Sequence, residues 1–276
     1  MSAYLPGTLA DLWNLLEEAD TAVMAGGTDF LVRRRAGKCA GRICCLERIP
    51  ELRGLEAENG VLEIGAATTL TDLLESRAVA ARLPMLHQAI RQLGSPLVRN
   101  QATLGGNICT ASPAGDTLPA LYTLGAQAVL MSRDAERVLD VAEFITGPGR
   151  TVLEPGEILA RVRIPLPDPG AMQHFEKVGR RRALAISVAS LTAVLRLDGD
   201  AVRDIRLAFG SVGPTVLRCA EAEAWLTGRA LTADNLRHAA GLVRSAVRPI
   251  DDVRATADYR RQVAGNLILR LEAYRP

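Results

Sequence analysis

Residues 99–119 read RNQATLGGNICTASPAGDTLP, and this stretch decides the fold. It lies in a longer segment, Gly94 to Pro119, in which glycine and proline interrupt the apolar spacing of the flanking sequence. We therefore predict a long irregular segment inside a compact domain. Such segments are usually functional.

A second glycine pair occurs near the N-terminus, in AGGTD at 25–29. Glycine lets successive backbone N–H groups point the same way, which makes a nest for phosphate oxygens. One Gly-Gly pair is weak support in a chain with 24 glycines, and its alternative is a tight turn. Two such loops suit a diphosphate, so we expect the amides near residues 26 and 106 to bind the same one.

The sequence before and after the first loop predicts a small β-α-β unit. Thr8 and Asp11 form a capping box for a helix that reaches about Ala19. A strand at 21–25 runs into the glycine loop, a helix starts at Phe30, and a short strand covers 43–46.

Further elements follow on both sides of the 94–119 segment. An Asn-Gly turn joins strands 55–57 and 61–64, Thr71 caps a helix at 72–80, and Pro84 opens the next helix. Strands resume at 128–132, 138–141 and 158–164.

The proline-rich residues 165–170 mark a domain boundary. Beyond it the pattern predicts two long strands and then three helices, which indicates a second, α+β domain. The expected strands are 185–197 and 202–211, and the expected helices are 219–226, 232–247 and 257–273.

Composition excludes several classes of partner. The chain has 33 Lys plus Arg and 31 Asp plus Glu, a balance that does not favour nucleic acid or an anionic membrane. Its longest uncharged apolar stretch, 183–195, is too short to span a bilayer, and the N-terminus does not resemble a secretory signal. We expect a cytoplasmic protein. The five cysteines show no C-x-x-C spacing, so we expect buried thiols and no metal or disulfide framework.

Common catalytic motifs are also absent from the sequence. There is no G-x-G-x-x-G and no P-loop, which argues against a Rossmann or P-loop nucleotide site. The three histidines are far apart and form no zinc motif, and Ser112 does not lie in a hydrolase nucleophile elbow.

Residues 99–119 as a whole resemble the flavin-binding stretch of molybdenum hydroxylase flavoproteins, the family of the xanthine dehydrogenase FAD domain and the carbon monoxide dehydrogenase medium subunit. The AGGTDF loop, Glu157-Ile-Leu159, Phe175-Glu-Lys177 and residues 180–187 also match, in family order. The resemblance implies an α+β chain: a two-part FAD-binding domain of the vanillyl-alcohol oxidase type at 1–167, divided into 1–52 and 53–167, and a C-terminal domain at 168–276.

The resemblance also implies a set of FAD-binding residues. The diphosphate side would be held by the first loop, comprising Ala25, Gly26, Gly27, Thr28, Asp29 and Phe30. The second loop would add Ala102, Thr103, Gly105, Gly106 and Asn107, of which Ala102 and Thr103 lie near the ribityl chain and flavin. Thr110, Ser112 and Asp116 would offer polar contacts, although Thr110 and Ser112 could equally shape a turn and Asp116 could cap a helix.

Three further positions match the surroundings of the flavin ring. Leu93 and Leu159 match ring neighbours, with plain core packing as the alternative, and Leu93 replaces an aromatic residue found in some relatives. Lys177 matches a lysine near the flavin; otherwise Lys177, Arg180, Arg181 and Arg182 form a solvated basic face, and the arginines could contact a partner subunit.

By resemblance, the chain is an FAD-binding electron-transfer subunit, with no catalytic residue or metal ligand of its own. A large subunit would hold the molybdenum cofactor, a small subunit would hold 2Fe–2S clusters, and FAD here would pass electrons to NAD or another acceptor. The alternatives are a stand-alone FAD-dependent oxidoreductase and a flavin-free scaffold subunit. The substrate of the whole complex is not encoded in this chain.

Overall fold

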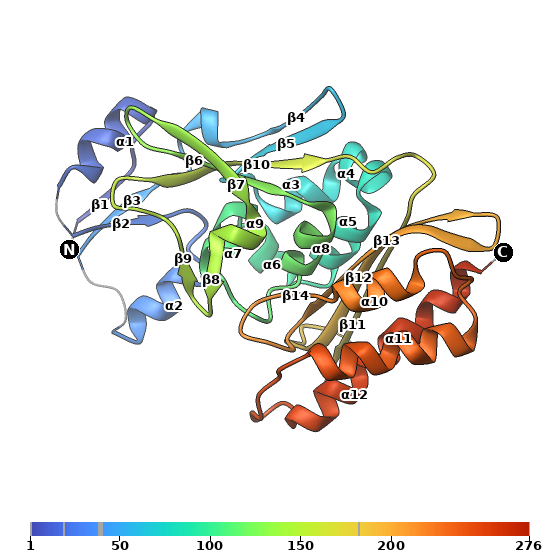
Figure 1. Cartoon of the computed structure of the whole chain (residues 1–276). Coiled ribbons are helices and arrows are strands. Elements are labelled where there is room, and N and C mark those ends of the chain that lie inside the picture. The colour runs from blue at the N-terminus through green and yellow to red at the C-terminus, as the bar shows by residue number, and fades with distance from the viewer. Residues whose placement is uncertain (1, 19, 38–40, 182, 276) are drawn as a thin grey trace. The chain divides into compact units, whose positions relative to one another are not determined.

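The computed structural model of the chain describes residues 2–18, 20–37, 41–181 and 183–275 (Figure 1). Ala19, Cys39 and Arg182, which the sequence predictions mention, lie outside the described residues. The chain forms two compact units, neither of which is continuous in sequence. Unit 1 comprises 1–75, 95–111 and 126–165, and unit 2 comprises 76–94, 112–125 and 166–276. The predicted division of the chain at residue 167 stays a prediction.

Unit 1 begins with the predicted β-α-β arrangement, a parallel sheet in the order β1-β3-β2. Its first helix, α1, starts where predicted because Thr8 Oγ1 accepts a hydrogen bond from Asp11 N, but it ends at Leu16. The elements of this part are β1 (Ala3–Tyr4), α1 (Leu9–Leu16), β2 (Thr21–Met24), α2 (Phe30–Arg35) and β3 (Arg42–Cys45).

The rest of unit 1 is built on a five-stranded antiparallel sheet in the order β4-β5-β10-β6-β7. Asn59 and Gly60, both with positive φ, make the predicted turn between β4 and β5. The bounds are β4 (Leu55–Glu58), β5 (Val61–Gly65), β6 (Gln127–Met131), β7 (Glu136–Asp140) and β10 (Ile158–Pro165), with η1 (Pro50–Leu52), α3 (Leu70–Glu75), α6 (Pro96–Arg99), α7 (Leu104–Thr110), α9 (Val141–Phe144), β8 (Ile145–Gly147) and β9 (Arg150–Thr151) around them.

The helix predicted at 72–80 with Thr71 as its cap is wrong. Thr69 caps α3, since its Oγ1 accepts from Asp72 N, and Ser76 caps a separate helix by accepting from Val79 N. The Thr71 hydroxyl instead donates to Asn100 Oδ1. A serine in the middle of an apolar pattern therefore ends one helix and starts another.

The prediction of a long irregular segment at 94–119 is also wrong, because two short helices and the start of a third occupy most of it. Ser95 caps α6 and Thr103 caps α7 through their side-chain oxygens. Pro96 stands at the first position of α6, where a helix needs no N–H donor. Glycine and proline at helix starts thus resembled loop residues in the sequence.

Unit 2 is built on an antiparallel sheet in the order β11-β12-β13-β14. The two long strands and three helices were predicted, with bounds within about two residues, except that α12 ends at Ile268 and continues as a 3₁₀ helix; β11 was not predicted as a strand. The bounds are β11 (Met172–Gly179), β12 (Ser187–Asp198), β13 (Ala201–Gly210), β14 (Leu217–Arg218), α4 (Arg77–Arg82), α5 (Pro84–Arg91), α8 (Thr117–Leu124), α10 (Ala220–Leu226), α11 (Ala233–Ala246), α12 (Ala257–Ile268) and η2 (Leu269–Tyr274).

Helices cover both faces of this sheet, which explains why β12 reads as one long apolar run. Successive residues of a strand face opposite sides. Leu191 and Ala193 pack into the core that contains residues of α10, α11 and α12. Thr192 faces the other way, and its Oγ1 lies 2.6 Å from Thr123 Oγ1 on α8, a helix whose eight residues are all buried. Strands covered on both faces lose the usual polar alternation.

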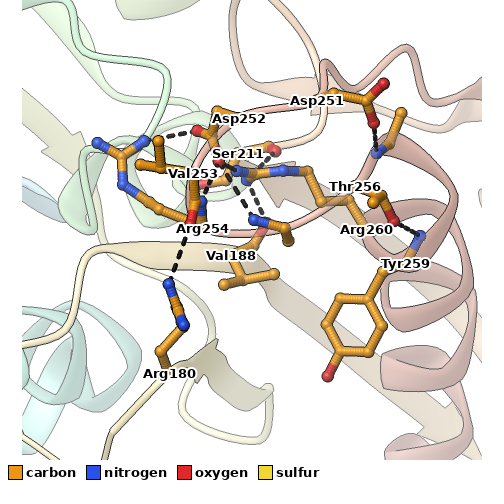
Figure 2. Close-up of polar contacts among 12 residues, drawn as sticks. Arg180, Val188, Ser211, Asp251, Asp252, Val253, Arg254, Thr256, Tyr259 and Arg260 are labelled. Carbon is orange, nitrogen blue, oxygen red and sulfur yellow. Dashed lines mark hydrogen bonds and ion pairs between the residues drawn. The ribbon is translucent and has the colours of Figure 1, made fainter.

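A buried arginine fixes the loop between α11 and α12 to the sheet (Figure 2). The Arg260 guanidinium donates to the carbonyl oxygens of Val188 and Ser211 and to Asp252 Oδ1, at 2.8, 3.2 and 2.7 Å. Asp252 in turn accepts from the backbone N–H groups of Arg254 and Ala255. The Asp252 carboxylate is therefore held by two arginines and by two backbone N–H groups of the loop.

No helix within the described ranges is long and apolar enough to cross a membrane.

Candidate functional site

The first glycine loop connects β2 to α2 in unit 1 and leaves its backbone donors unused. Gly27 has a φ of +70°, a conformation that glycine adopts without steric cost. Within the part of the chain that the structure describes, the amides of Gly26, Gly27, Thr28 and Asp29 donate no hydrogen bond. Consecutive unpaired amides of this kind form an anion-binding loop.

The second glycine pair anchors the start of α7 within unit 1. Gly105 N donates to Ala66 O at 2.9 Å and Gly106 N donates to Thr103 Oγ1 at 3.0 Å, so neither amide is a free donor. Gly105 is required for close packing instead, since a Cβ there would lie 2.5 Å from the Cβ of Ala66. These amides therefore cap and anchor α7, and the expectation that they bind the same diphosphate as the first loop stays a prediction.

The two segments nevertheless meet, as expected. A Cβ at Gly26 would lie 1.6 Å from the carbonyl oxygen of Gln101 and 3.1 Å from Ala102 N. The Thr110 hydroxyl also donates to Asp29 Oδ2 at 3.3 Å, which joins the end of α7 to the first loop. This bond is neither of the two expected roles of Thr110, and its contact with the cofactor stays a prediction.

A cavity of about 150 Å³ lies behind these loops in unit 1. Ala25, Gly105, Gly106 and Leu159 from the predicted set line it. Sequence reasoning did not assign the remaining lining residues, which are mostly apolar: Val23, Leu46, Ala66, Cys109, Leu153, Glu157 and Ile158. Cys109, Glu157 and Ile158 lie in stretches that match the family, although their place in the cavity was not predicted. No motif marks the other four, which come from β2 and from the ends of strands.

Two of these lining residues have settled protonation states. Burial raises the pKa of the Cys109 thiol to about 12, so it is neutral. Glu157 forms a two-point ion pair with Arg137, at 2.8 and 2.7 Å, and this hydrogen bonding lowers the pKa of Glu157. The carboxylate is therefore ionised and already bound, which makes it a poor proton donor.

Asp116 and Lys177 form a buried ion pair in unit 2. Lys177 Nζ lies 2.6 Å from Asp116 Oδ2, and the two side chains are 4% and 8% exposed. Lys177 lies directly opposite Ser190 of β12 in the sheet. Ser190 shares a face with Thr192, which contacts α8, so the Lys177 side chain also lies on the α8 side. The alternative of a solvated basic face is wrong for Lys177, although Arg180 and Arg181 are exposed.

Asp116 is poised to accept one more hydrogen bond. Its position precedes α8, yet its side chain makes no capping bond, so the helix-cap alternative is wrong. The buried Oδ1 atom has no partner among the described residues. Burial raises the pKa of Asp116 to about 6, and the adjacent Lys177 ammonium opposes this rise. An orphaned buried acceptor is unfavourable by itself and points to a donor from a ligand.

The other predicted residues of unit 2 have weaker signals. Ser112 Oγ accepts a hydrogen bond from Ala114 N, which is the turn-shaping role. Leu93 is half-buried at the end of α5. Neither observation assigns a ligand contact.

The features of unit 1 suit a ligand with a diphosphate, because the first loop offers consecutive free amides and the adjacent cavity is mostly apolar. In unit 2, Asp116 Oδ1 offers an acceptor to a hydroxyl or amine donor. Among the described residues, no three His, Cys, Asp or Glu side chains are grouped to hold a metal ion.

Comparison with known proteins agrees with the resemblance seen in the sequence. The family described as FAD binding domain in molybdopterin dehydrogenase matches residues 1–167, and the CO dehydrogenase flavoprotein C-terminal domain matches residues 173–273. The chain is 36% identical to the xanthine dehydrogenase FAD-binding subunit of Escherichia coli O157:H7, over 94% of this chain and 90% of that one. It is 32% identical to the carbon monoxide dehydrogenase medium chain of Hydrogenophaga pseudoflava, over 91% and 88%.

Solved structures give the same result for the fold. The carbon monoxide dehydrogenase of Hydrogenophaga pseudoflava matches with a TM-score of 0.93 and 32% identity, over 98% of this chain and 95% of that one. Quinoline 2-oxidoreductase from Pseudomonas putida 86 matches with a TM-score of 0.94 and 25% identity, over 100% and 96%. The predicted α+β class, with an FAD-binding domain and a C-terminal domain, is confirmed. The chain therefore belongs to the FAD-binding medium subunits of the molybdenum hydroxylase family and is an oxidoreductase subunit.

Proposed function

We propose that this chain holds FAD with the cofactor diphosphate on the first glycine loop, and that it relays electrons within a molybdenum hydroxylase complex. The observation that carries the proposal is the set of consecutive unpaired amides at Gly26, Gly27, Thr28 and Asp29. Gly26 itself lies against the backbone of Gln101 and Ala102. Consecutive backbone donors in a glycine loop can bind phosphate oxygens without a cationic side chain.

The surrounding residues of unit 1 would shape the rest of this cofactor site. Thr110 holds Asp29 in place, while Gly106 keeps the cavity wall free of a side chain. Leu159 adds apolar surface to that cavity. The predicted contacts in this unit are Ala25, Phe30, Ala102, Thr103, Gly105 and Asn107.

The residues of unit 2 would contribute polar contacts of another kind. Asp116 would accept a hydrogen bond from a cofactor hydroxyl through its unpartnered Oδ1. Leu93 and Ser112 remain predicted neighbours of the cofactor.

FAD when bound accepts electrons one at a time and releases them as a pair. The chain's own groups supply binding and a shielded, largely apolar surface. Relatives are named medium chains, which supports a large molybdenum-containing subunit and a small 2Fe–2S subunit as partners. NAD or another carrier would take the electrons from this subunit.

The stand-alone oxidoreductase would need an acid or base of its own at the flavin. The titratable groups at the described cavity do not provide one, because Cys109 is held neutral and Glu157 is held ionised by Arg137. A flavin-free scaffold would not explain why the first loop keeps unpaired amides and why the buried Asp116 Oδ1 has no donor among the described residues.

Flavin binding is tested by titrating the purified chain with FAD, with FMN as the diphosphate-free comparison. We expect one FAD per chain and weaker binding of FMN. Gly106→Leu should abolish FAD retention because the side chain would fill the cavity wall. Gly7→Leu is the control, since a Cβ at Gly7 meets no atom within 4 Å. A folded Gly106→Leu variant with unchanged FAD content would refute the placement.

The partner proposal is tested separately by purifying the tagged chain from its native cells. Molybdenum and iron should copurify at a fixed ratio with two further chains. A flavin-loaded chain that purifies alone, and reduces an acceptor with its own substrate, would favour the stand-alone oxidoreductase.

A further inference from the structure

The loop between α11 and α12 in unit 2, residues 247–256, exposes two aliphatic side chains to solvent. Val253 is 89% exposed and Ile250 is 72% exposed, and Val253 is the most exposed large apolar side chain of the described residues. A single exposed aliphatic side chain is ordinary on a protein surface. Two of them on one short loop forgo the free energy of burial together.

Polar contacts hold this loop in place (Figure 2). The Asp252 carboxylate accepts from the backbone N–H groups of Arg254 and Ala255 and pairs with the Arg260 guanidinium. Further hydrogen bonds fix both ends and the middle of the loop: Arg248 N to Val212 O, Ala257 N to Asp251 Oδ1, and Arg180 Nη1 to Val253 O. The loop backbone therefore cannot fold its aliphatic side chains back onto unit 2. A surface that is already ordered loses little conformational entropy on binding.

The charges around the loop are mostly positive. The loop and its contacts carry four guanidinium groups and two carboxylates, a formal excess of two positive charges: Arg180, Arg248, Arg254, Arg260, Asp251 and Asp252. Within the described ranges, Arg180 and Arg248 donate from their side chains only to backbone carbonyl oxygens, so no carboxylate compensates their charges. A partner face with Asp or Glu at its border would be complementary, whereas a second copy of the same loop would bring like charges together.

We infer that this loop is a docking site for a partner subunit of the complex, and that the matching face of the partner is an apolar depression bordered by Asp or Glu. Val253 and Ile250 enter the depression, and Arg180 and Arg248 meet the carboxylates. An apolar centre with a polar rim is the usual anatomy of a protein interface. The inference rests on the proposed function, which supplies the partner subunits, and adds the surface at which one of them binds.

Two charges placed at Val253 test the docking site in the tagged chain purified from its native cells. Val253→Glu puts a carboxylate into an apolar depression with an acidic border, whereas Val253→Lys puts a complementary charge there. Molybdenum and iron per chain in the purified material are the readout. We expect Val253→Glu to lower at least one of the two metals by about tenfold or more. Val253→Lys should lower the same metal by no more than about threefold.

A matched control and a folding check accompany these variants. Val138→Glu is the control, because Val138 is also an exposed valine, at 42%, but lies in unit 1. It should leave both metals unchanged. FAD titration reports whether each chain is folded, and Val253→Glu should bind FAD within about twofold of wild type, since no residue of the loop belongs to the predicted cofactor set. If Val253→Glu does not fold, Ile250→Glu makes the same test on the second anchor.

Unchanged molybdenum and iron in a folded Val253→Glu chain would overturn the inference. Equal losses from Val253→Glu and Val253→Lys would contradict an acidic border on the partner. An isolated wild-type chain that is dimeric by light scattering, and that Val253→Glu makes monomeric, would overturn the inference in favour of a second copy. A wild-type chain that retains neither metal would instead refute the partner part of the proposed function, and the inference with it. The wild type is purified in the same series, so the two failures are distinguishable.

Discussion

Gly26 lies so close to Gln101 that a Cβ atom at position 26 would be 1.6 Å from the Gln101 carbonyl oxygen. Real atoms cannot approach to that distance, so any side chain would push the first loop away from the segment that leads into α7. We predict that Gly26→Ala lowers FAD affinity by at least a hundredfold, about 3 kcal/mol, as measured by titration of the purified chain.

Gly7→Ala is the matched control for this variant, because Gly7 lies in the same unit, has no positive φ and has open space at its Cβ position. It should bind FAD like the wild type. Equal FAD affinity in a folded Gly26→Ala variant would contradict the close approach.

The Thr110 hydroxyl joins α7 to the first loop through Asp29. Thr110→Val keeps the side-chain shape and removes the donor, so Asp29 loses one restraint. We expect FAD affinity to fall by roughly fivefold, the value of about 1 kcal/mol for one hydrogen bond. Thr71→Val, which removes the exposed bond to Asn100, is the control and should leave affinity unchanged. If Thr71→Val lowered FAD affinity as much as Thr110→Val, the loss would reflect a general effect on unit 1 and would contradict a specific role of the Thr110–Asp29 bond.

The Asp252 cluster predicts how unit 2 responds to acid (Figure 2). The N–H of Arg254 and the Arg260 guanidinium lower the pKa of Asp252 to about 2. A carboxyl with a folded-state pKa below its unfolded value of about 3.9 stabilises the fold above that value, and the contribution is lost as pH falls toward 2.

Asp252→Asn should therefore be less stable than the wild type by a constant amount above about pH 4, and the difference should shrink as pH falls below 4. Urea unfolding followed by fluorescence of Trp225, which lies in unit 2, measures both proteins. A difference in stability between the two proteins that stays constant down to about pH 2.5, or grows, would contradict the lowered pKa of Asp252.

Arg260 links the same loop to the rest of unit 2 by donating to three acceptors, of which two are backbone carbonyl oxygens and one is Asp252. Arg260→Met should destabilise unit 2 by about 2 kcal/mol, because the carbonyl oxygens of Val188 and Ser211 lose a buried donor, while Asp252 keeps its bonds to Arg254 and Ala255. The measurement is the urea midpoint at neutral pH. A loss below about 0.5 kcal/mol would show that the Arg260 bonds contribute no more to stability than an exposed ion pair does.

The regular parts of the fold were predictable because their signals are local. The Thr8 cap, the Asn-Gly hairpin and the long strands of unit 2 all depend on neighbouring residues. The 94–119 segment was not predictable in the same way, since Ser95 and Thr103 turn proline and glycine into helix starts. The segment also divides between units, because 95–111 pack in unit 1 and 112–125 in unit 2.

The candidate site shows the same limit of local reasoning. The two glycine pairs were visible in sequence and their approach was predicted, but the direction of each amide depends on partners such as Ala66, far along the chain. Lys177 followed by a run of arginines resembled a surface, but the register of β11 on β12 puts its side chain on the buried face that α8 covers. Lys177, the partner of Asp116, is 61 residues away, so no local pattern links the two side chains.

One measurement tests the central claim most directly: amide chemical shifts in a chain labelled with ¹³C-carbonyl and ¹⁵N glycine. The sequence has Gly-Gly pairs only at 26–27 and 105–106, so a carbonyl-to-amide correlation spectrum shows just Gly27 and Gly106. Adding FAD to saturation should shift the Gly27 amide strongly, because it gains a phosphate acceptor. The Gly106 amide already donates to Thr103 and should shift less. An unmoved Gly27 signal in the FAD-saturated chain would contradict the account.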